Sequence, residues 1–333
     1  MTGYEKNRLI FLLWLQHSFT MTISRGRPES NVDSYLVRLT ERILPGMLRE
    51  KPERRDELRA YFLAALDENG GFRGRKGHGD LYYSAFALRG LFLLGMLDDE
   101  KLLPRITDFL REHQSRTDLS PPDILSWTLC MFLVHAVQGK DFLPEQTASL
   151  CERWERFRCY DGCFASSEKT ALSSTYTTFL AAVFYELLGE SERSRSIPVK
   201  PILERQRQDG GFVELSPLQY SGTNPTAAAV GLFTILDVPL PEKQKTVDFL
   251  YRCQRPTGGF QAHARIPIPD LLSSFSALTA LHDLDALDRL NRQTLRNFVL
   301  SLRSPDGGFY GMLSDQQSDV EYTFYGMALE AML

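Results

Sequence analysis

The sequence predicts an all-α protein built from six helical hairpins, and three observations support this fold class. A Gly-Gly-Phe motif or a close relative of it recurs along the 333 residues, an amphipathic segment precedes it, and an apolar segment follows it. The motif phenylalanines are Phe72, Phe164, Phe212, Phe260 and Phe309. They are 92, 48, 48 and 49 residues apart, so the first gap spans about two periods and a sixth copy near residue 118 has lost its glycines. Two helices in each such repeat predict a curved array, either open or closed into a ring.

The apolar segments align without gaps and predict the inner helices of this array. Each alignment begins at Asp, Ser or Thr, residue types that cap a helix by accepting a backbone N–H of its first turn. The predicted caps are Asp80, Asp123, Ser173, Thr223, Asp270 and Asp319. The helices that follow are apolar almost all round, as in "AFALRGLFLLGML" (85–97), which is typical of helices that are buried or line a shared interior.

The segments before each motif predict outer helices that cover the inner ones. Residues 241–254, "PEKQKTVDFLYRCQ", place Val247, Leu250 and Tyr251 on one side and the lysines on the other, and residues 293–303 behave alike. The motif glycines permit the positive φ that helix C-caps require. We expect each motif phenylalanine to pack between neighbouring repeats.

Composition and charge exclude several classes of protein. The net charge of -4 leaves no basic footprint for nucleic acid. No segment reaches the roughly 18 apolar residues that a membrane span needs. The nearest candidate, "LIFLLWL" (9–15), is short and lacks a small-residue cleavage pattern, so we expect a docked N-terminal helix rather than a signal peptide. We divide the chain into an N-terminal helical extension, 1–52, and the repeat domain, 53–333.

The cysteines indicate the cellular compartment. The chain has 5 of them, an odd number, and none forms a Cys-x-x-Cys pair. Disulfide frameworks and common zinc motifs have other spacings. Reduced thiols and a cytoplasmic location are therefore expected.

The motif loops and residues 319–333, "DVEYTFYGMALEAML", resemble the β-subunits of protein prenyltransferases. The resemblance covers roughly residues 53–333 and is closest to the Rab geranylgeranyltransferase type, with this chain as a divergent, bacterial-type member. Squalene–hopene and class II terpene cyclases have similar loops. The resemblance implies a closed α/α toroid of six hairpins whose central cavity holds an isoprenoid tail. It also implies a helical α-subunit as a possible partner, with self-association as the alternative.

Aromatic residues near the starts of the inner helices are the candidate cavity wall. Such side chains can bury a polyprenyl chain at about 0.8 kcal/mol per methylene, although packing between helices also explains each residue singly. The candidates, with one acidic neighbour, are Tyr82, Tyr83, Trp127, Tyr176, Phe179, Phe275, Glu321, Tyr322 and Tyr325.

The resemblance also locates the family's zinc site. In the family, zinc is held by the Asp and Cys of an Asp-x-Cys motif and by a His that precedes Thr. Asp270 matches the aspartate, but Leu272 replaces the cysteine and Tyr322 replaces the histidine. Leucine cannot coordinate a metal and neutral tyrosine is a poor zinc ligand. Asp270 is therefore expected to be a helix cap. We expect the protein to have no cofactor. Zinc or magnesium is expected only if the chain is catalytically active.

Basic side chains near the expected cavity mouth are the candidates for diphosphate binding. The family places an arginine and a lysine between Gly-Gly-Phe and Asp-x-Cys, where this chain has "QAHARIPIP". A second basic loop, "FRGRKGHGD", precedes Asp80. Solvated surface charge is the alternative reading. The candidates are His263, Arg265, Arg73, Arg75 and Lys76.

The function that the sequence favours is a prenyltransferase β-subunit-like protein. Its cavity would bind an isoprenoid, such as a prenyl diphosphate, or another hydrophobic ligand, with the zinc-dependent chemistry lost or altered. One alternative is an active farnesyl- or geranylgeranyltransferase subunit with a helical partner. Others are a small terpene cyclase, although the chain has no Asp-x-Asp-Asp acid, and a non-catalytic scaffold.

Overall fold

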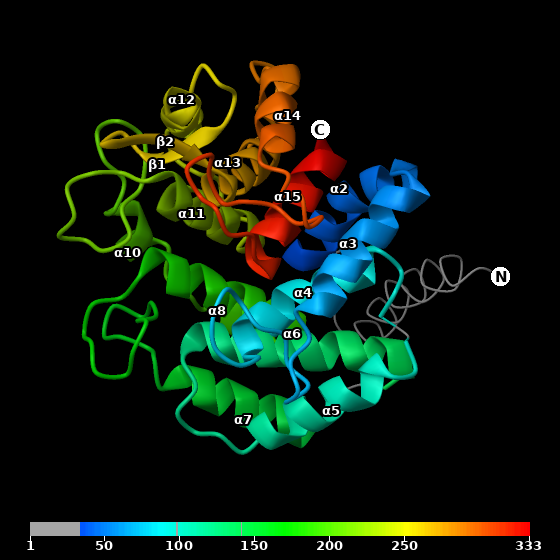
Figure 1. Ribbon diagram of the computed structural model, residues 1–333. Helices are drawn as coiled ribbons and strands as arrows, with labels where there is room; N and C mark the ends of the chain where they lie inside the picture. Colours follow the sequence, from blue (N-terminus) through cyan, green and yellow to red (C-terminus); the bar gives the residue numbers. More distant parts are fainter. Residues whose placement is uncertain (1–33, 98, 141) are drawn as a thin grey trace.

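The computed structural model describes residues 34–97, 99–140 and 142–333, and these form two concentric layers of helices (Figure 1). The apolar stretch 9–15 lies outside them. The inner helices are α4 (Leu81–Leu93), α6 (Pro121–Gln138), α8 (Thr175–Leu187), α11 (Thr223–Ile235), α13 (Leu271–Asp283) and α15 (Val320–Met332). The outer layer is α3 (Pro52–Ala64), α5 (Leu102–His113), α7 (Pro144–Glu155), the short α9 (Ser191–Arg195) and α10 (Lys200–Leu203), α12 (Lys243–Cys253) and α14 (Arg292–Ser301). The predicted arrangement of six helical hairpins is confirmed.

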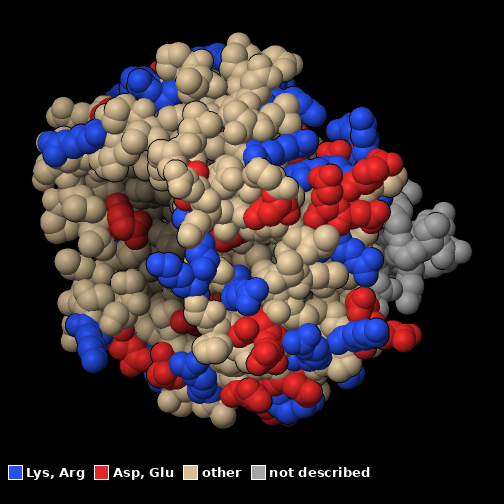
Figure 2. All heavy atoms as spheres, in the orientation of Figure 1, with Lys and Arg blue, Asp and Glu red and all other residues tan. Residues whose placement is uncertain are grey.

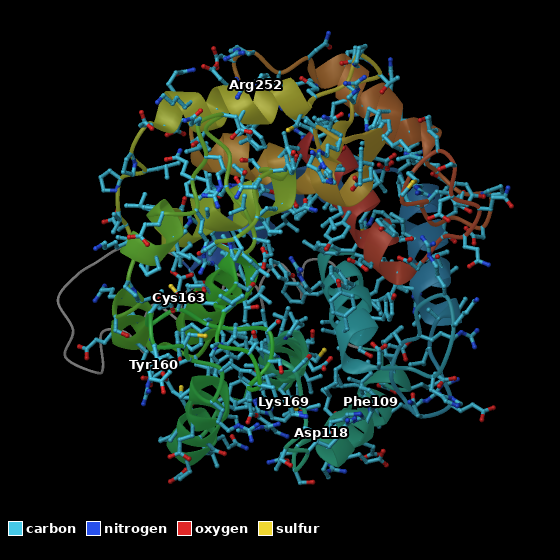
Figure 3. All side chains as sticks on the ribbon, turned by 90° about the vertical axis from the view of Figure 1, so that its left-hand side faces the viewer. Phe109, Asp118, Tyr160, Cys163, Lys169 and Arg252 are labelled. Atoms are coloured by element: carbon cyan, nitrogen blue, oxygen red, sulfur yellow. The ribbon has the colours of Figure 1, made fainter. Side chains whose placement is uncertain are left out.

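The array closes into a toroid through contacts between its last and first repeats. Helix α15 lies beside α4 in both ribbon views (Figures 1 and 3). The Tyr82 hydroxyl of α4 donates to Glu321 Oε1 of α15 at 2.8 Å. In the outer layer, Arg54 Nη1 donates to the Gly307 carbonyl at 2.9 Å. The closure implied by the family resemblance is thus present in the structure.

Helix α2 (Tyr35–Arg49) covers the end of the ring where the inner helices finish. The backbone N–H of Tyr35 donates to Glu186 Oε2 in the last turn of α8 at 2.8 Å, and the Tyr35 hydroxyl donates to Asp283 at the end of α13 at 3.2 Å. Arg42 pairs with the same aspartate, with Nη1 2.7 Å from Oδ1. Farther along α2, Gly46 lies against the backbone of Ala331 in α15. Helix α2 therefore ties together three inner helices at one end of the toroid.

The motif loops join the layers through a repeated hydrogen bond. Each motif phenylalanine is fully buried, and its N–H donates to a Ser or Thr hydroxyl in the first turn or so of the next inner helix. The acceptors are Ser84, Thr178, Thr226, Ser274 and Thr323. In the motif that ends at Phe212, Gly210 has a φ of +86°. A Cβ there would lie 2.2 Å from the Lys245 carbonyl oxygen, so only glycine fits.

Three of the predicted caps are confirmed and three are wrong. Asp80, Asp270 and Asp319 each accept the backbone N–H three residues on. Helix α6 instead begins after Ser120, and Asp123 is the third helical residue, where it forms a capping box with that serine. Two prolines follow Ser120 and suit the first turn of a helix, so they move the start forward.

The other two cap errors reflect contacts with neighbouring loops. The Ser173 hydroxyl donates a hydrogen bond to Asp161 and accepts one from the Arg205 guanidinium. Ser174 caps α8 in its place. Thr223 is the first residue of α11 rather than its cap, and its hydroxyl donates to the Gln261 carbonyl of the next repeat at 2.6 Å. Aligning the repeats locates the Ser or Thr at the start of each inner helix, but it does not show whether the hydroxyl caps that helix or forms a hydrogen bond with a neighbouring loop.

One segment forms strands that the sequence did not predict. Strands β1 (Phe260–His263) and β2 (Ile266–Asp270) make an antiparallel hairpin just before α13, with Phe260 opposite Asp270. The β-branched Ile266 and Ile268 favour extended backbone. This hairpin projects over the start of the inner helices (Figure 1).

Two predictions from composition also bear on the described residues. None of the helices formed by residues 34–97, 99–140 and 142–333 is both long and apolar enough to cross a bilayer. All five cysteines carry free thiols, as predicted.

Candidate functional site

The inner helices enclose a hollow that is lined by aromatic rings. Tyr82 packs on Phe86 with ring centroids 5.1 Å apart, and Phe86 packs on Tyr325 at 5.3 Å. Phe275 of α13 continues the cluster, 5.1 Å from the Tyr325 ring. Figure 2 shows the molecular surface hollowed on the side where the inner helices begin, with mostly uncharged atoms at the border.

Tyr176 shows that the aromatic wall continues across the ring. This residue lies in the first turn of the inner helix α8, yet 44% of its surface is exposed. Its phenol is close enough to Glu321 of α15 and Arg89 of α4 for their charges to act on its pKa. Helix α8 is not a sequence neighbour of α4 or α15, so these groups face one another across the hollow. Desolvation of the phenol within the ring and the charges of Glu321 and Glu214 raise the pKa of Tyr176 to about 12, while the charge of Arg89 opposes the rise.

Glu321 is the acidic group of this wall. Its Oε1 accepts hydrogen bonds from the Tyr82 hydroxyl at 2.8 Å and the Tyr325 hydroxyl at 3.3 Å. Burial raises the pKa of Glu321, and the nearby charge of Asp319 adds to this, while the two phenol hydrogen bonds oppose it. The carboxyl is therefore held by donors but is easier to protonate than an exposed glutamate.

Three other predicted wall residues lie at the edges of the hollow. Tyr83 packs edge-on against Tyr82 and covers Gly74 of the first motif loop. Tyr322 lies beneath the Arg75 guanidinium, 5.4 Å from its ring centroid. Phe179 is deeper and packs edge-on against Tyr35 of α2, with centroids 5.4 Å apart.

Trp127 does not belong to this wall. Its side chain is 4% exposed, and the indole N–H donates to the Leu110 carbonyl of the outer helix α5 at 2.8 Å. The residue therefore fills the space between the two layers, which was the alternative explanation of the sequence pattern. Trp127 was assigned to the wall because it follows Asp123, the predicted cap of α6, by four residues, but that helix begins after Ser120.

The residues at the family's zinc position do not fit a zinc ion. Asp270 Oδ1 accepts the Ser273 N–H at 2.7 Å and Oδ2 accepts the Ser273 hydroxyl at 2.8 Å. The neighbouring Tyr322 has its pKa raised to about 12 by burial and by the charges of Glu321 and Asp270, so its phenol stays protonated. Across residues 34–97, 99–140 and 142–333, no three His, Cys, Asp or Glu side chains are grouped as metal ligands would be.

The candidate phosphate-binding residues lie on two separate loops, and most of them have partners. Arg75 Nε lies 2.7 Å from Asp319 and Nη2 lies 2.5 Å from Asp315, so two carboxylates neutralise it. Arg73 is exposed and donates to the Ala64 carbonyl at 3.3 Å, and Lys76 is exposed.

The second loop is the β1–β2 hairpin. There the Arg265 guanidinium lies over the exposed Tyr220 ring, 3.5 Å from the centroid. The His263 Nδ1 accepts the Arg265 backbone N–H at 3.2 Å. These contacts hold the two side chains on the rim.

The sequence analysis missed two residues of the hollow, Phe86 and Arg89, and the fully buried Phe324 that packs behind them. The Arg89 guanidinium lies over the Phe324 ring, 4.2 Å from its centroid. A single arginine within "AFALRGLFLLGML" was the available signal, because an isolated charge inside an apolar inner helix needs a structural or functional reason.

Comparison with known proteins places the chain in a family. The model of the prenyltransferase alpha-alpha toroid domain matches residues 5–110, 97–239 and 226–333. The chain belongs to this family. A 94-residue segment is 32% identical to the β-subunit of protein farnesyltransferase from Pisum sativum, and it spans 27% of this chain and 22% of that protein. That subunit is thus matched over only about a fifth of its length.

Solved structures share the toroid at low sequence identity. Candida albicans protein geranylgeranyltransferase-I in complex with GGPP has a TM-score of 0.61 and 13% identity, over 89% of this chain and 91% of that one. The type II terpene cyclase MstE from Scytonema, in complex with geranylgeranyl dihydroxybenzoate, has a TM-score of 0.56 and 11% identity, over 87% and 97%. An α-1,6-mannanase of Salegentibacter has a TM-score of 0.55 and 15% identity, over 84% and 98%. These likenesses establish the fold, which supports several chemistries.

Replacing Asp270 with asparagine is expected to change stability by less than about 1 kcal/mol at neutral pH, because the amide oxygen can still cap α13. Burial raises the pKa of Asp270, so the ionised carboxyl disfavours the folded state. That penalty is absent below the unfolded-state pKa and appears as the pH rises through the folded-state pKa. Urea unfolding at neutral pH and elemental analysis for zinc will test this. Stoichiometric zinc in the parent protein that disappears in the variant would contradict the expectation.

Proposed function

We propose that this family member binds a long-chain hydrophobic ligand, an isoprenoid or its diphosphate, in the central hollow, without the zinc chemistry of the protein prenyltransferases. The supporting observation is the aromatic wall contributed by α4, α8, α13 and α15, in which Tyr176 remains 44% exposed. An exposed aromatic side chain inside an otherwise closed ring is apolar area that a ligand would bury. Each methylene of such a ligand would contribute about 0.8 kcal/mol.

The similar structures make an isoprenoid the first ligand to test. The Candida albicans transferase was solved with GGPP, and MstE with geranylgeranyl dihydroxybenzoate, both on the same toroid. Their low sequence identity carries no residue-level argument to this chain. The argument for this chain rests on its own rings, spaced 5.1 to 5.3 Å apart around the hollow.

The altered zinc position supports binding without the family's transfer step. In the family, three protein ligands hold the zinc ion that binds the substrate thiolate. Here Leu272 and Tyr322 replace two of those three ligands. Both carboxylate oxygens of Asp270 already accept hydrogen bonds from Ser273. In this proposal the chain resembles a Rab geranylgeranyltransferase-type β-subunit that has kept ligand binding and lost the transfer step. A helical partner or a second copy of the chain is part of the same proposal.

The decisive experiment is a titration of the purified protein with a fluorescent geranylgeranyl diphosphate analogue, with and without added zinc. We expect saturable binding at micromolar concentration that zinc does not change. Tyr176→Ala should weaken binding about tenfold, equivalent to roughly 1.4 kcal/mol. Tyr160→Ala is the matched control, because Tyr160 is a fully exposed tyrosine of an outer loop (Figure 3), and it should bind like the parent.

Other outcomes would point to the alternatives. Absence of saturable binding would reject the ligand-binding function and leave a scaffold. Zinc-dependent transfer of the prenyl group to a thiol would show an active transferase despite Leu272 and Tyr322. Conversion of the prenyl chain into a cyclic product would show a cyclase.

A further inference from the structure

Arg89 projects into the hollow well below its mouth. It is nine residues beyond the Asp80 cap of α4, which corresponds to about 13 Å along a helix. Tyr82, Phe86 and Arg89 are spaced i, i+4 and i+7, so they share one face of α4. Because Tyr82 and Phe86 belong to the aromatic wall, Arg89 lies on that wall about one turn deeper.

Arg89 has no anionic partner within the part of the chain that the structure describes. Its only close contact with a charged or aromatic group is the Phe324 ring beneath it, and the groups that raise its pKa are the phenols of Tyr325 and Tyr176. Burial lowers the pKa of Arg89 to about 10, so the guanidinium is still charged at neutral pH. The Arg89 side chain is half-buried, and none of its nitrogens is among the fully buried atoms that lack a hydrogen-bond partner, so the guanidinium can be reached from the hollow. A partly desolvated charge without an anionic partner favours an anionic ligand.

Arg54 and Arg205, the arginines buried most deeply among the described residues, both have acceptors, which distinguishes them from Arg89. Arg205 is 1% exposed, and its guanidinium reaches the Ser173 and Thr175 hydroxyls and the Asp161 carboxylate. Arg42 is paired with Asp283. The fold therefore supplies acceptors where arginine has a structural role, and it supplies none at Arg89.

Tyr176 offers a second free donor facing Arg89. Both side chains keep accessible surface inside the ring, and the charge of each acts on the pKa of the other across the hollow. The hydroxyls of Tyr82 and Tyr325 already donate to Glu321. The Tyr176 hydroxyl makes no hydrogen bond with the described residues, and its ring is the exposed one.

We propose that the hollow takes a long-chain carboxylic acid, whose carboxylate binds inside the toroid between Arg89 and Tyr176. The proposal rests on the proposed ligand-binding function and names the ligand's polar group. A planar carboxylate matches the two parallel donors of a guanidinium, and the phenol adds a third hydrogen bond.

The charge balance favours a monoanion over a diphosphate at this depth. One guanidinium compensates one negative charge, and Glu321 is near enough to act on the Tyr176 phenol, so additional anionic charge would be repelled. At the rim, Arg75 is already neutralised by Asp315 and Asp319. Arg73 and Arg265 also lack a carboxylate partner among the described residues, but both are exposed to solvent at the rim, so Arg89 is the half-buried arginine that can hold a head group inside the hollow.

The test compares ligands with one chain and different head groups. Geranylgeranoic acid and geranylgeraniol are titrated by displacement of the fluorescent analogue or by calorimetry, with arachidic acid and arachidyl alcohol as the straight-chain pair. We expect the acid of at least one pair to bind ten times or more tightly than its alcohol. Arg89→Met should remove that preference, whereas Arg73→Met, at an exposed rim arginine, should keep it.

The outcomes separate this proposal from the one on which it rests. Alcohols that bind as tightly as acids, or an acid preference that survives Arg89→Met, would overturn the carboxylate site while ligand binding stands. If none of the ligands binds, both proposals are rejected. Tyr176→Phe provides an independent variant, expected to reduce the acid preference two- to fivefold without affecting the alcohol. Arg89→Met should not lower the melting temperature, because it removes a half-buried charge that has no anionic partner among the described residues, and circular dichroism checks that the variant is folded.

Discussion

Arg42→Leu is expected to destabilise the folded chain by about 3–5 kcal/mol, the usual cost of removing one partner from a buried ion pair. The Asp283 carboxylate has no exposed side-chain surface and lies 2.7 Å from Arg42. Without the guanidinium, only the Tyr35 hydroxyl at 3.2 Å would remain as a donor to this buried charge. Since the pair joins α2 to the end of α13, we expect α2 to loosen from the ring.

The pH dependence follows from the same carboxylate. Burial raises the pKa of Asp283, and Arg42 opposes this, so the variant should raise that pKa further. A carboxyl whose folded-state pKa is raised destabilises the fold increasingly as the pH rises above its unfolded-state pKa. The difference in unfolding free energy between parent and variant should therefore shrink as the pH falls and Asp283 takes up a proton.

Urea unfolding at neutral pH and at about pH 5 measures both effects. Arg49→Leu is the matched control, because Arg49 is an exposed arginine of the same helix and should change stability by less than about 0.5 kcal/mol. The double variant Arg42→Leu with Asp283→Leu should recover much of the loss, because no unpaired charge is left. A loss below about 1 kcal/mol in the single variant would show that the pair is not holding α2.

The fold was predictable because its chemical requirements recur. Each repeat needs a glycine turn, a buried phenylalanine and a Ser or Thr hydroxyl that accepts the phenylalanine N–H, and these recur at nearly fixed spacing. The cap at Ser174 was missed because the neighbouring Ser173 hydroxyl is engaged by another loop, and the cap at Ser120 was missed because the two prolines after it belong to the first turn of α6. The alternation of apolar and amphipathic segments therefore predicts the two layers of helices, but it does not predict the residue at which each helix begins or ends.

The site was less predictable than the fold because it depends on which helix faces meet across the ring. A helix that is apolar on all sides does not reveal which side is inner, so Trp127 and Tyr325 looked alike in the sequence. In the structure, the Trp127 side chain contacts the outer layer, whereas the Tyr325 side chain packs in the aromatic wall of the hollow. The partner of Arg89 could not be inferred either, because ring closure places its neighbours Tyr176 and Phe324.

Phe309→Ala is the second change with a large expected effect, about 3–5 kcal/mol, the usual loss for truncating a buried phenylalanine. The ring is fully buried where the last repeat meets the first. It packs on Gly326, where a Cβ would lie 2.4 Å from the ring, and the Arg54 guanidinium of α3 lies 5.3 Å from its centroid. Few atoms could move into the space left, since Gly326 has no side chain.

Phe212→Ala separates the loss of packing from the loss of ring closure. Phe212 occupies the same position in the same motif and is equally buried, but it lies between repeats that are consecutive in the chain. Both variants should lose similar free energy in urea unfolding. Only Phe309→Ala should accelerate amide hydrogen exchange in α3 and α15, because no covalent connection holds those helices together. Equal exchange in the two variants would mean that the Tyr82–Glu321 and Arg54–Gly307 hydrogen bonds keep the toroid closed without this ring.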